Sequence, residues 1–270
     1  MPELPEVETT RRGVEPHLAG RRIAALEVRD PRLRWPVAPD IATTVTGQRV
    51  TAVDRRAKYL LIRLETGSLM LHLGMSGSLR IVPAEAPLRT HDHLELVLDD
   101  GHRLRFHDPR RFGSLHWVPR GTEHPLLARL GPEPLAEAFD GAWLRRALTG
   151  RRAAVKTALM DARVVVGVGN IYASEALFRA GIHPTRPAGR ISRQRLDRLA
   201  DAVKCVLSEA IAAGGTTLRD FYGGDGQPGY FRQSLSVYGR AGEPCPGCGE
   251  AVRQRVIGQR SSYYCPRCQR

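Results

Sequence analysis

The sequence contains very little lysine. Only Lys58, Lys156 and Lys204 are lysines among its 41 basic residues, and all the others are arginines. Arginine stays protonated in proteins and cannot act as an amine nucleophile. Covalent chemistry that needs an amine is therefore restricted to three lysine side chains and the amino group at the start of the chain.

Long hydrophobic runs are also absent. No apolar stretch approaches the length of a membrane span, and no basic stretch followed by an apolar segment marks a secretion signal. The sequence has no internal repeat and no low-complexity tail. We therefore expect a soluble intracellular protein, long enough at 270 residues for one large or two modest domains.

Acidic residues are too few to balance the basic ones. The 28 Asp and Glu leave a formal net charge of +13 and a pI of about 10.3. A polyanionic partner explains this charge, and nucleic acid is favoured over a membrane because no basic amphipathic helix dominates. The alternative is a solvated basic surface in an arginine-rich proteome.

Periodicity divides the chain into two halves. Apolar residues at helical spacing predict a helix over residues 4–18, and about eight short runs within 22–118, such as KYLLIRL and HLELVL, predict strands. The fold class is thus α+β, with an N-terminal β-sandwich or barrel and an N-terminal helix. Residues 119–134 are rich in Pro and Gly, which indicates a linker.

From residue 142 onward the pattern is helical. Its clearest helix runs from Ser192, a candidate N-cap, to Gly214, with lone Cys205 expected in the core. The glycine-rich stretch 214–230 cannot form a packed element, so we expect a mobile loop there.

The other four cysteines form two close pairs in the tail, with sixteen residues between the pairs. Four thiolates at this spacing suit one tetrahedral zinc ion, whereas two disulfides or spare thiols are the alternatives. A CxxC bridge is strained and no secretion signal is present, so zinc is favoured. The intervening RQRVIGQRSSYY predicts a basic hairpin. The ligands would be Cys245, Cys248, Cys265 and Cys268.

Three further motifs could contact nucleic acid. In GVGNIYASE, glycines precede a helix whose first amides could hold a phosphate, although a simple turn is the commoner outcome. Met75 in HLGMSG follows a strand on a tight turn, and Arg110 and Phe112 in DPRRFG would share one side of a strand. Such residues suit wedging into a base stack beside a base-reading guanidinium, but taken alone Met75 and Phe112 are better explained as core residues.

The chain opens with MPELPEVE, which places two acids behind a proline. Removal of Met1 would leave Pro2 as a terminal secondary amine with a pKa near neutrality, a usable nucleophile. Glu3 and Glu6, three residues apart, could have divergent pKa values that suit one as an acid. The alternative is an ordinary acidic helix N-terminus stabilised by the helix dipole.

Together, MPELPEVE, RRAKYL, HLGMSG, DPRRFG, GVGNIYASE, VYGR and the four-cysteine tail resemble the formamidopyrimidine-DNA glycosylase family, in order and over the whole chain. The related endonuclease VIII branch usually opens PEGPE and lacks the Met, Arg and Phe set. The resemblance implies a catalytic β-sandwich domain over 1–130, a helix-two-turn-helix domain over 131–230 with a lid loop at 214–230, and a zinc finger over 236–270.

The resemblance also implies roles for single residues. Pro2 would be the nucleophile, Glu3 the proton donor at the sugar and Glu6 a supporting carboxylate. Lys58 would contact phosphate and transfer a proton in β-elimination, and Arg260 would hold phosphate and assist δ-elimination. The implied DNA-binding residues are His72, Met75, His91, Arg110, Phe112, Arg151, Lys156, Asn170 and Tyr238, where Arg151 replaces a common lysine and Lys156 would lie near the damaged-base pocket.

The implied activity is excision of oxidised purines such as 8-oxoguanine and formamidopyrimidines, followed by β,δ-elimination. A base must leave the duplex to be reached, so a wedge, a pocket and a lid are expected. Expected partners are damaged double-stranded DNA and one zinc ion, and the protein is expected to be a monomer in the bacterial cytoplasm, at the nucleoid. The alternatives are a preference for oxidised pyrimidines and a non-catalytic zinc-finger DNA-binding protein.

Overall fold

The computed structural model describes residues 2–215 and 234–270, so nearly all of the expected lid loop lies outside the described residues. The described residues form two compact units, one from 2–128 with 213–215 and the other from 129–212 with 234–270. No helix within the described ranges is long and apolar enough to cross a membrane.

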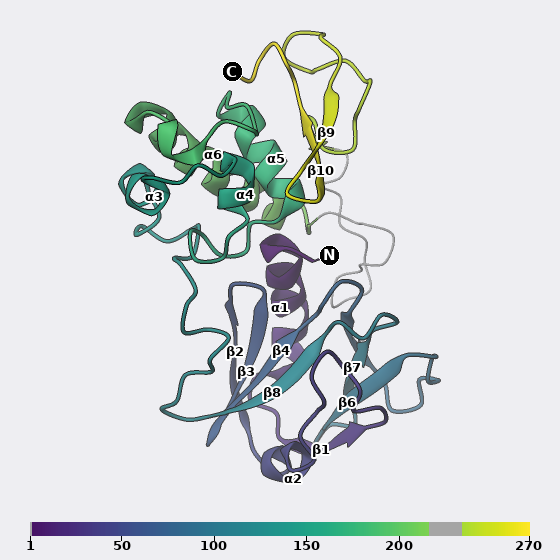
Figure 1. Ribbon diagram of the computed structural model, residues 1–270. Helices are drawn as coiled ribbons and strands as arrows, with labels where there is room; N and C mark the ends of the chain where they lie inside the picture. The colour runs from purple at the N-terminus through teal and green to yellow at the C-terminus, as the bar shows by residue number, and fades with distance from the viewer. Residues whose placement is uncertain (1, 216–233) are drawn as a thin grey trace. The chain divides into compact units, whose positions relative to one another are not determined.

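The first unit is a β-sandwich with a helix at its start, as predicted. Its eight strands form two antiparallel four-stranded sheets with orders β1-β6-β7-β5 and β2-β3-β4-β8, and α1 packs on β2 (Figure 1). The elements are α1 (Leu4–Leu18), β1 (Ile23–Val28), α2 (Ile41–Val45), β2 (Val50–Arg56), β3 (Tyr59–Leu64), β4 (Gly67–His72), β5 (Ser78–Val82), β6 (Asp92–Leu98), β7 (Arg103–His107) and β8 (Ser114–Pro119).

Alternation along the strands builds the core of this unit. Leu94, Leu96 and Leu98 of β6 point into one cluster together with Leu104 and Phe106 of β7. The same cluster receives residues of the second sheet and both helices, so the apolar faces of the two sheets enclose a single core.

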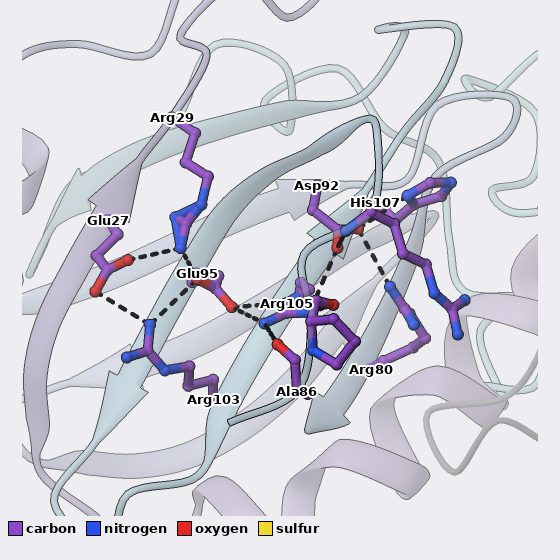
Figure 2. A network of polar contacts seen from close by, with 11 residues as sticks. Glu27, Arg29, Arg80, Ala86, Asp92, Glu95, Arg103, Arg105 and His107 are labelled. Atoms are coloured by element: carbon purple, nitrogen blue, oxygen red, sulfur yellow. Dashed lines mark hydrogen bonds and ion pairs between the residues drawn. The ribbon is translucent and has the colours of Figure 1, made fainter. Parts of the chain in front are cut away.

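The opposite face of β6 and β7 carries a buried network of charges, shown in Figure 2. Arg105 is only 2% exposed and donates to Glu95 Oε1 at 2.6 Å, to the carbonyls of Ala86 and Pro87, and more weakly to Asp92. Buried charges stay ionised only when such partners satisfy them. Arg105 thereby fixes the loop over residues 83–91 on the sheet.

The second unit contains the helices and the tail hairpin. Its elements are α3 (Gly141–Leu148), α4 (Val155–Leu159), α5 (Asn170–Arg179), a 3₁₀ turn η1 (Ala188–Arg190), α6 (Arg193–Ala212), β9 (Arg253–Ile257) and β10 (Arg260–Tyr264). Residues 120–140, between β8 and α3, form neither helix nor strand, which agrees with the linker predicted over part of this range.

Helix α6 begins at Arg193, directly after the predicted N-cap Ser192, and buries apolar residues at helical spacing. The prediction for Cys205 was wrong, because this thiol is exposed and interacts with Glu209 and Arg179. Position 205 follows Val203 by two residues, which turns it about 200° around the helix from that buried side chain.

The tail hairpin packs on the helices of the same unit. Gly258 and Gln259 both have positive φ, 56° and 60°, which is the geometry of a two-residue hairpin turn that matches strand twist. Strand β10 packs against α5, and the Gln269 amide donates to the Ile182 carbonyl at 2.9 Å. The helices and the hairpin therefore form one unit.

Candidate active site and nucleic-acid interface

The start of the chain is buried and held by an acid. Glu3 and Glu6 are each 3% exposed, and Pro2 is buried as well. The Glu3 backbone N–H donates to Glu6 Oε2 at 2.8 Å, which caps the first turn of α1. Acids at an ordinary helix start usually face solvent, so their burial favours a specific role for this pair over the dipole alternative.

Lys58 and His72 lie close together in the first unit. Burial first, and then the positive charges of Lys58 and Arg34, lower the pKa of His72 to about 4. Its Nδ1 accepts the Gly74 N–H at 3.0 Å, so the proton of the neutral ring is on Nε2. His72 can thus offer a phosphate an uncharged N–H donor, beside a cationic lysine.

The predicted wedge residues come from two neighbouring loops. Phe112 is 41% exposed, Met75 is half-buried, and the Arg110 guanidinium carbon lies 5.2 Å from the Phe112 ring centre. The prediction that Arg110 and Phe112 lie on a strand was wrong, because residues 108–113 form a loop in which Arg111 has φ 54°. Exposure of Phe112 favours the wedge over the core interpretation.

His91 ends the loop over residues 83–91 and is exposed, with φ 75°. A positive φ is uncommon outside glycine and needs support from the surrounding structure. The support here is the Asp108 N–H, which donates to the His91 carbonyl at 3.0 Å, and Asp92, whose Oδ2 accepts the Arg89 N–H at 2.9 Å.

Asn170 is the first residue of α5 and lies in a hydrogen-bonded cluster in the second unit. Its Nδ2 donates to the Ser261 carbonyl at 3.0 Å and lies 3.4 Å from the Tyr238 hydroxyl. The preceding residue, Gly169, is the N-cap of this helix and makes no side-chain hydrogen bond to it.

Lys156 joins the same cluster from α4 and is 1% exposed. Its ammonium donates to Asn170 Oδ1, to Ser262 Oγ at 2.6 Å and to the Ser261 carbonyl at 3.2 Å. This placement favours support of Asn170 by Lys156, in place of the open damaged-base pocket suggested by the resemblance.

Arg151 is half-buried and donates to Asp161 Oδ2 at 2.9 Å. Burial alone would raise the pKa of Asp161, but hydrogen bonds from Arg163 and Arg151 outweigh it and lower the pKa to about 2. Asp161 is therefore ionised at neutral pH, and Arg151 would approach a phosphate with one side of its guanidinium already paired.

The four tail cysteines converge as predicted. Their sulfur atoms all lie within 4.8 Å of one another, with Cys245–Cys268 at 3.9 Å and Cys248–Cys265 at 3.5 Å. A disulfide needs about 2.05 Å, whereas Zn–S bonds of 2.3 Å in a tetrahedron separate sulfurs by about 3.8 Å. The donor set fits one structural zinc ion. Exposed Arg260 begins β10, directly after the hairpin turn.

The sequence was compared with protein families and curated relatives. Residues 1–115 match the formamidopyrimidine-DNA glycosylase N-terminal domain, 130–222 match the H2TH domain of the same enzyme, and 242–270 match a zinc finger found in FPG and IleRS. Formamidopyrimidine-DNA glycosylases of Stenotrophomonas maltophilia and Methylococcus capsulatus are 62% and 60% identical, over the full length of both chains.

This chain belongs to the formamidopyrimidine-DNA glycosylase family. Solved structures agree: the MutM (Fpg) protein of Thermus thermophilus aligns with a TM-score of 0.89 at 47% identity, over 99% of this chain and 98% of that one. The Lactococcus lactis Fpg in complex with DNA containing an abasic site aligns at 0.92 and 32% identity, over 99% of each chain.

Sequence reasoning missed one residue that supports this family's site. Glu175 is 3% exposed, and its carboxylate accepts three consecutive backbone N–H groups, from Ser236 at 2.8 Å, Val237 at 3.0 Å and Tyr238 at 2.8 Å. It therefore holds the segment that carries Tyr238. The available signal was an acid within the largely apolar stretch IYASEALF, where a charge needs a specific partner.

Proposed function

We propose that this chain is a bifunctional DNA glycosylase and lyase of base excision repair, which removes oxidised purines from double-stranded DNA and then cleaves the strand. Family membership over the full chain supports the glycosylase activity, and relatives bind DNA with an abasic site or with carbocyclic 8-oxo-G. The observation that carries the proposal is the buried start of the chain, where Pro2 and Glu3 precede α1 and Glu6 accepts the Glu3 backbone N–H.

Pro2 would act after removal of Met1. Its nitrogen lone pair attacks C1′ of the damaged nucleotide, the glycosidic bond breaks, and the base leaves with the proton that the Pro2 nitrogen loses. Glu3 protonates the sugar ring oxygen, and the bond between that oxygen and C1′ then breaks to give an iminium. The resulting iminium withdraws electrons, so C2′ loses a proton and the 3′ phosphate leaves. Loss of a C4′ proton and of the 5′ phosphate completes the second elimination, and water releases the sugar fragment from Pro2.

The lysines are weaker candidates for the nucleophile. Lys156 is buried and its ammonium donates to three acceptors, so deprotonation would break a satisfied cluster. Lys58 keeps the role of phosphate contact and proton transfer, beside the neutral His72 ring. Lys204 lies on α6 and belongs to none of the motifs that carry the resemblance.

DNA contacts would come from both units. Phosphates would be held by His72, His91, Asn170, Tyr238, Arg151 and Arg260, while Met75 and Phe112 fill the space left by the extruded base and Arg110 reads the opposite cytosine. Because one chain supplies the reactive start and all of these contacts, we also propose that the enzyme acts as a monomer.

Borohydride trapping on DNA that contains 8-oxoguanine tests the proposal, with the adduct mapped by mass spectrometry. We expect the adduct on Pro2 and none in protein that retains Met1. An adduct on a lysine with Pro2 unmodified would contradict the assigned nucleophile. A panel of oxidised purines and pyrimidines in the same assay tests the substrate class. Preferred cleavage of pyrimidine lesions would assign this chain the substrate preference of the endonuclease VIII branch.

The two acids are tested separately on two substrates. Glu3→Gln is expected to block base excision but to leave much of the cleavage of a preformed abasic site, because that substrate has already lost its base. Equal loss of both activities would show that Glu3 does not act as the proton donor to the sugar.

A further inference from the structure

The buried side chain of Asp108 bonds to both loops that carry the proposed wedge. Asp108 is fully buried, and its Oδ1 accepts the Ser76 hydroxyl at 2.8 Å and the Arg110 N–H at 3.3 Å. Its Oδ2 accepts the Gly113 N–H at 2.8 Å. One carboxyl group thus joins the turn around Met75 to the loop that carries Arg110 and Phe112.

The backbone of Asp108 extends the same connection to the His91 loop. Its N–H donates to the His91 carbonyl at 3.0 Å, and its carbonyl lies 2.9 Å from His93 Nε2. Three segments far apart in the sequence therefore meet at one residue, and each carries a side chain proposed to contact DNA.

The two wedge loops also touch backbone to backbone. A Cβ added to Gly74 would lie 2.4 Å from the Phe112 carbonyl carbon and 2.5 Å from the Gly113 nitrogen. No side chain separates the loops at this point, so a shift of one loop moves the other. The Asp108 carboxyl fixes the direction of that contact through hydrogen bonds, which depend on angle as well as distance.

We propose that Asp108 is the positioning residue that makes the Met75 turn and the Arg110–Phe112 loop act as one unit when they enter the DNA. This inference rests on the proposed function, since it concerns how the wedge is held. Asp108 touches no DNA in this arrangement, and it acts through Arg110 N and Ser76 Oγ.

Two substitutions separate its two connections. Asp108→Asn keeps only one acceptor oxygen. With that oxygen on the Gly113 N–H, the new amide can donate to the Ser76 hydroxyl. The Arg110 N–H then loses Asp108 Oδ1, faces the amide as a second donor, and keeps only its 3.3 Å contact with Ser76 Oγ. Ser76→Ala removes the bond between Asp108 and the Met75 turn. The Arg110 N–H loses its Ser76 contact but keeps Asp108 Oδ1, and the Gly113 N–H keeps Oδ2. Exposed Asp99→Asn, on the β6–β7 turn of the same unit, is the matched control.

The experiment measures excision of 8-oxoguanine opposite cytosine and opposite adenine. It also measures the fluorescence of 2-aminopurine placed next to the lesion, which changes when the wedge residues enter the base stack. We expect Asp108→Asn to reduce the preference for cytosine by about tenfold, the size of one good base contact. Arg110→Ala added to Asp108→Asn should then change the preference little further. Ser76→Ala should lower the fluorescence change while it keeps the preference, and Asp99→Asn should alter neither.

Retained preference in Asp108→Asn, or an unchanged fluorescence response in Ser76→Ala, would overturn the inference, as would a wild-type enzyme without any preference. Urea unfolding checks each variant, and Ser76→Ala decides alone if Asp108→Asn does not fold. Borohydride trapping of the wild type on abasic DNA tests the proposed function independently. If trapping occurs but the variants keep the cytosine preference and the fluorescence response, only the role of Asp108 is refuted. If no trapping occurs, the proposed function is refuted.

Discussion

Removal of the Glu175 carboxylate should loosen the segment that carries Tyr238. The carboxylate accepts three backbone N–H groups, and each donor left without a partner costs roughly 1–3 kcal/mol when buried. Val237 is fully buried, but Ser236 and Tyr238 are half-buried and regain part of this through water. We therefore expect Glu175→Ala to lower the free energy of unfolding by about 3–5 kcal/mol.

Glu175→Gln makes the estimate sharper. Glutamine keeps one oxygen, which can still serve the Val237 and Tyr238 donors that share Oε1, while its amide faces the Ser236 N–H as a second donor. The loss should then be about 1–3 kcal/mol, the cost of a single orphaned donor. Glu243→Gln, at an exposed pair with Arg240, is the control and should cost at most about 1 kcal/mol.

Urea unfolding and amide hydrogen exchange measure these effects. Exchange at residues 236–238 should accelerate at all three amides in Glu175→Ala and mainly at Ser236 in Glu175→Gln. Affinity for abasic DNA should fall in the same order, because Tyr238 loses its fixed position. Equal destabilisation by the two substitutions, or unchanged exchange at Val237 in Glu175→Ala, would refute the reasoning.

Three other outcomes follow from the same structure. Cys248→Ser should abolish the one zinc ion per chain measured by metal analysis and should unfold the tail. Arg260→Ala should keep the zinc and reduce the salt slope of DNA binding by ~0.9, and an unchanged slope would exclude a phosphate contact at Arg260. Because the pKa of folded His72 is about 4 against 6.5 unfolded, its contribution to stability rises with pH between these values by up to about 3 kcal/mol; His72→Gln should flatten this part of the pH profile in urea unfolding. Arg105→Met removes one of the three arginine partners of buried Glu95, together with the donors to the Ala86 and Pro87 carbonyls. Because Arg29 and Arg103 still pair with Glu95, the cost should be about 3 kcal/mol in the same assay, whereas exposed Arg32→Met should change little.

Sequence patterns predicted the features that repeat along the chain. Helix α6 follows from apolar residues at helical spacing, which it buries in the second unit, and strands β3, β4, β6 and β7 follow from short alternating or apolar runs that are buried in the first unit. The cysteine spacing predicted the metal site equally well, since two CxxC pairs have few other uses in a chain without a secretion signal.

Features that depend on a single partner could not be predicted in this way. Nothing in the pattern distinguishes Arg105 from surface arginines, because its burial depends on Glu95 and on carbonyls of a distant loop. The resemblance implies a DNA contact for Lys156, which stays a prediction, but no pattern indicates that its acceptors lie on Asn170 and on β10. The prediction of a strand at DPRRFG was wrong because Arg111 takes a left-handed backbone conformation, which the alternation of side chains in the sequence does not reveal.

Several irregular segments of this chain are held by buried acids, although its net charge is +13. Glu6, Asp92, Asp108 and Glu175 are each at most 5% exposed, and each accepts a backbone N–H from an irregular segment that carries or adjoins a proposed site residue. A carboxylate has two oxygens that each accept several donors, so one acid can fix a segment that no helix or sheet ladder holds. The negative charge inside also offsets the repulsion among the arginines outside. The segments that carry the proposed site residues thus depend on buried acids for their backbone conformation.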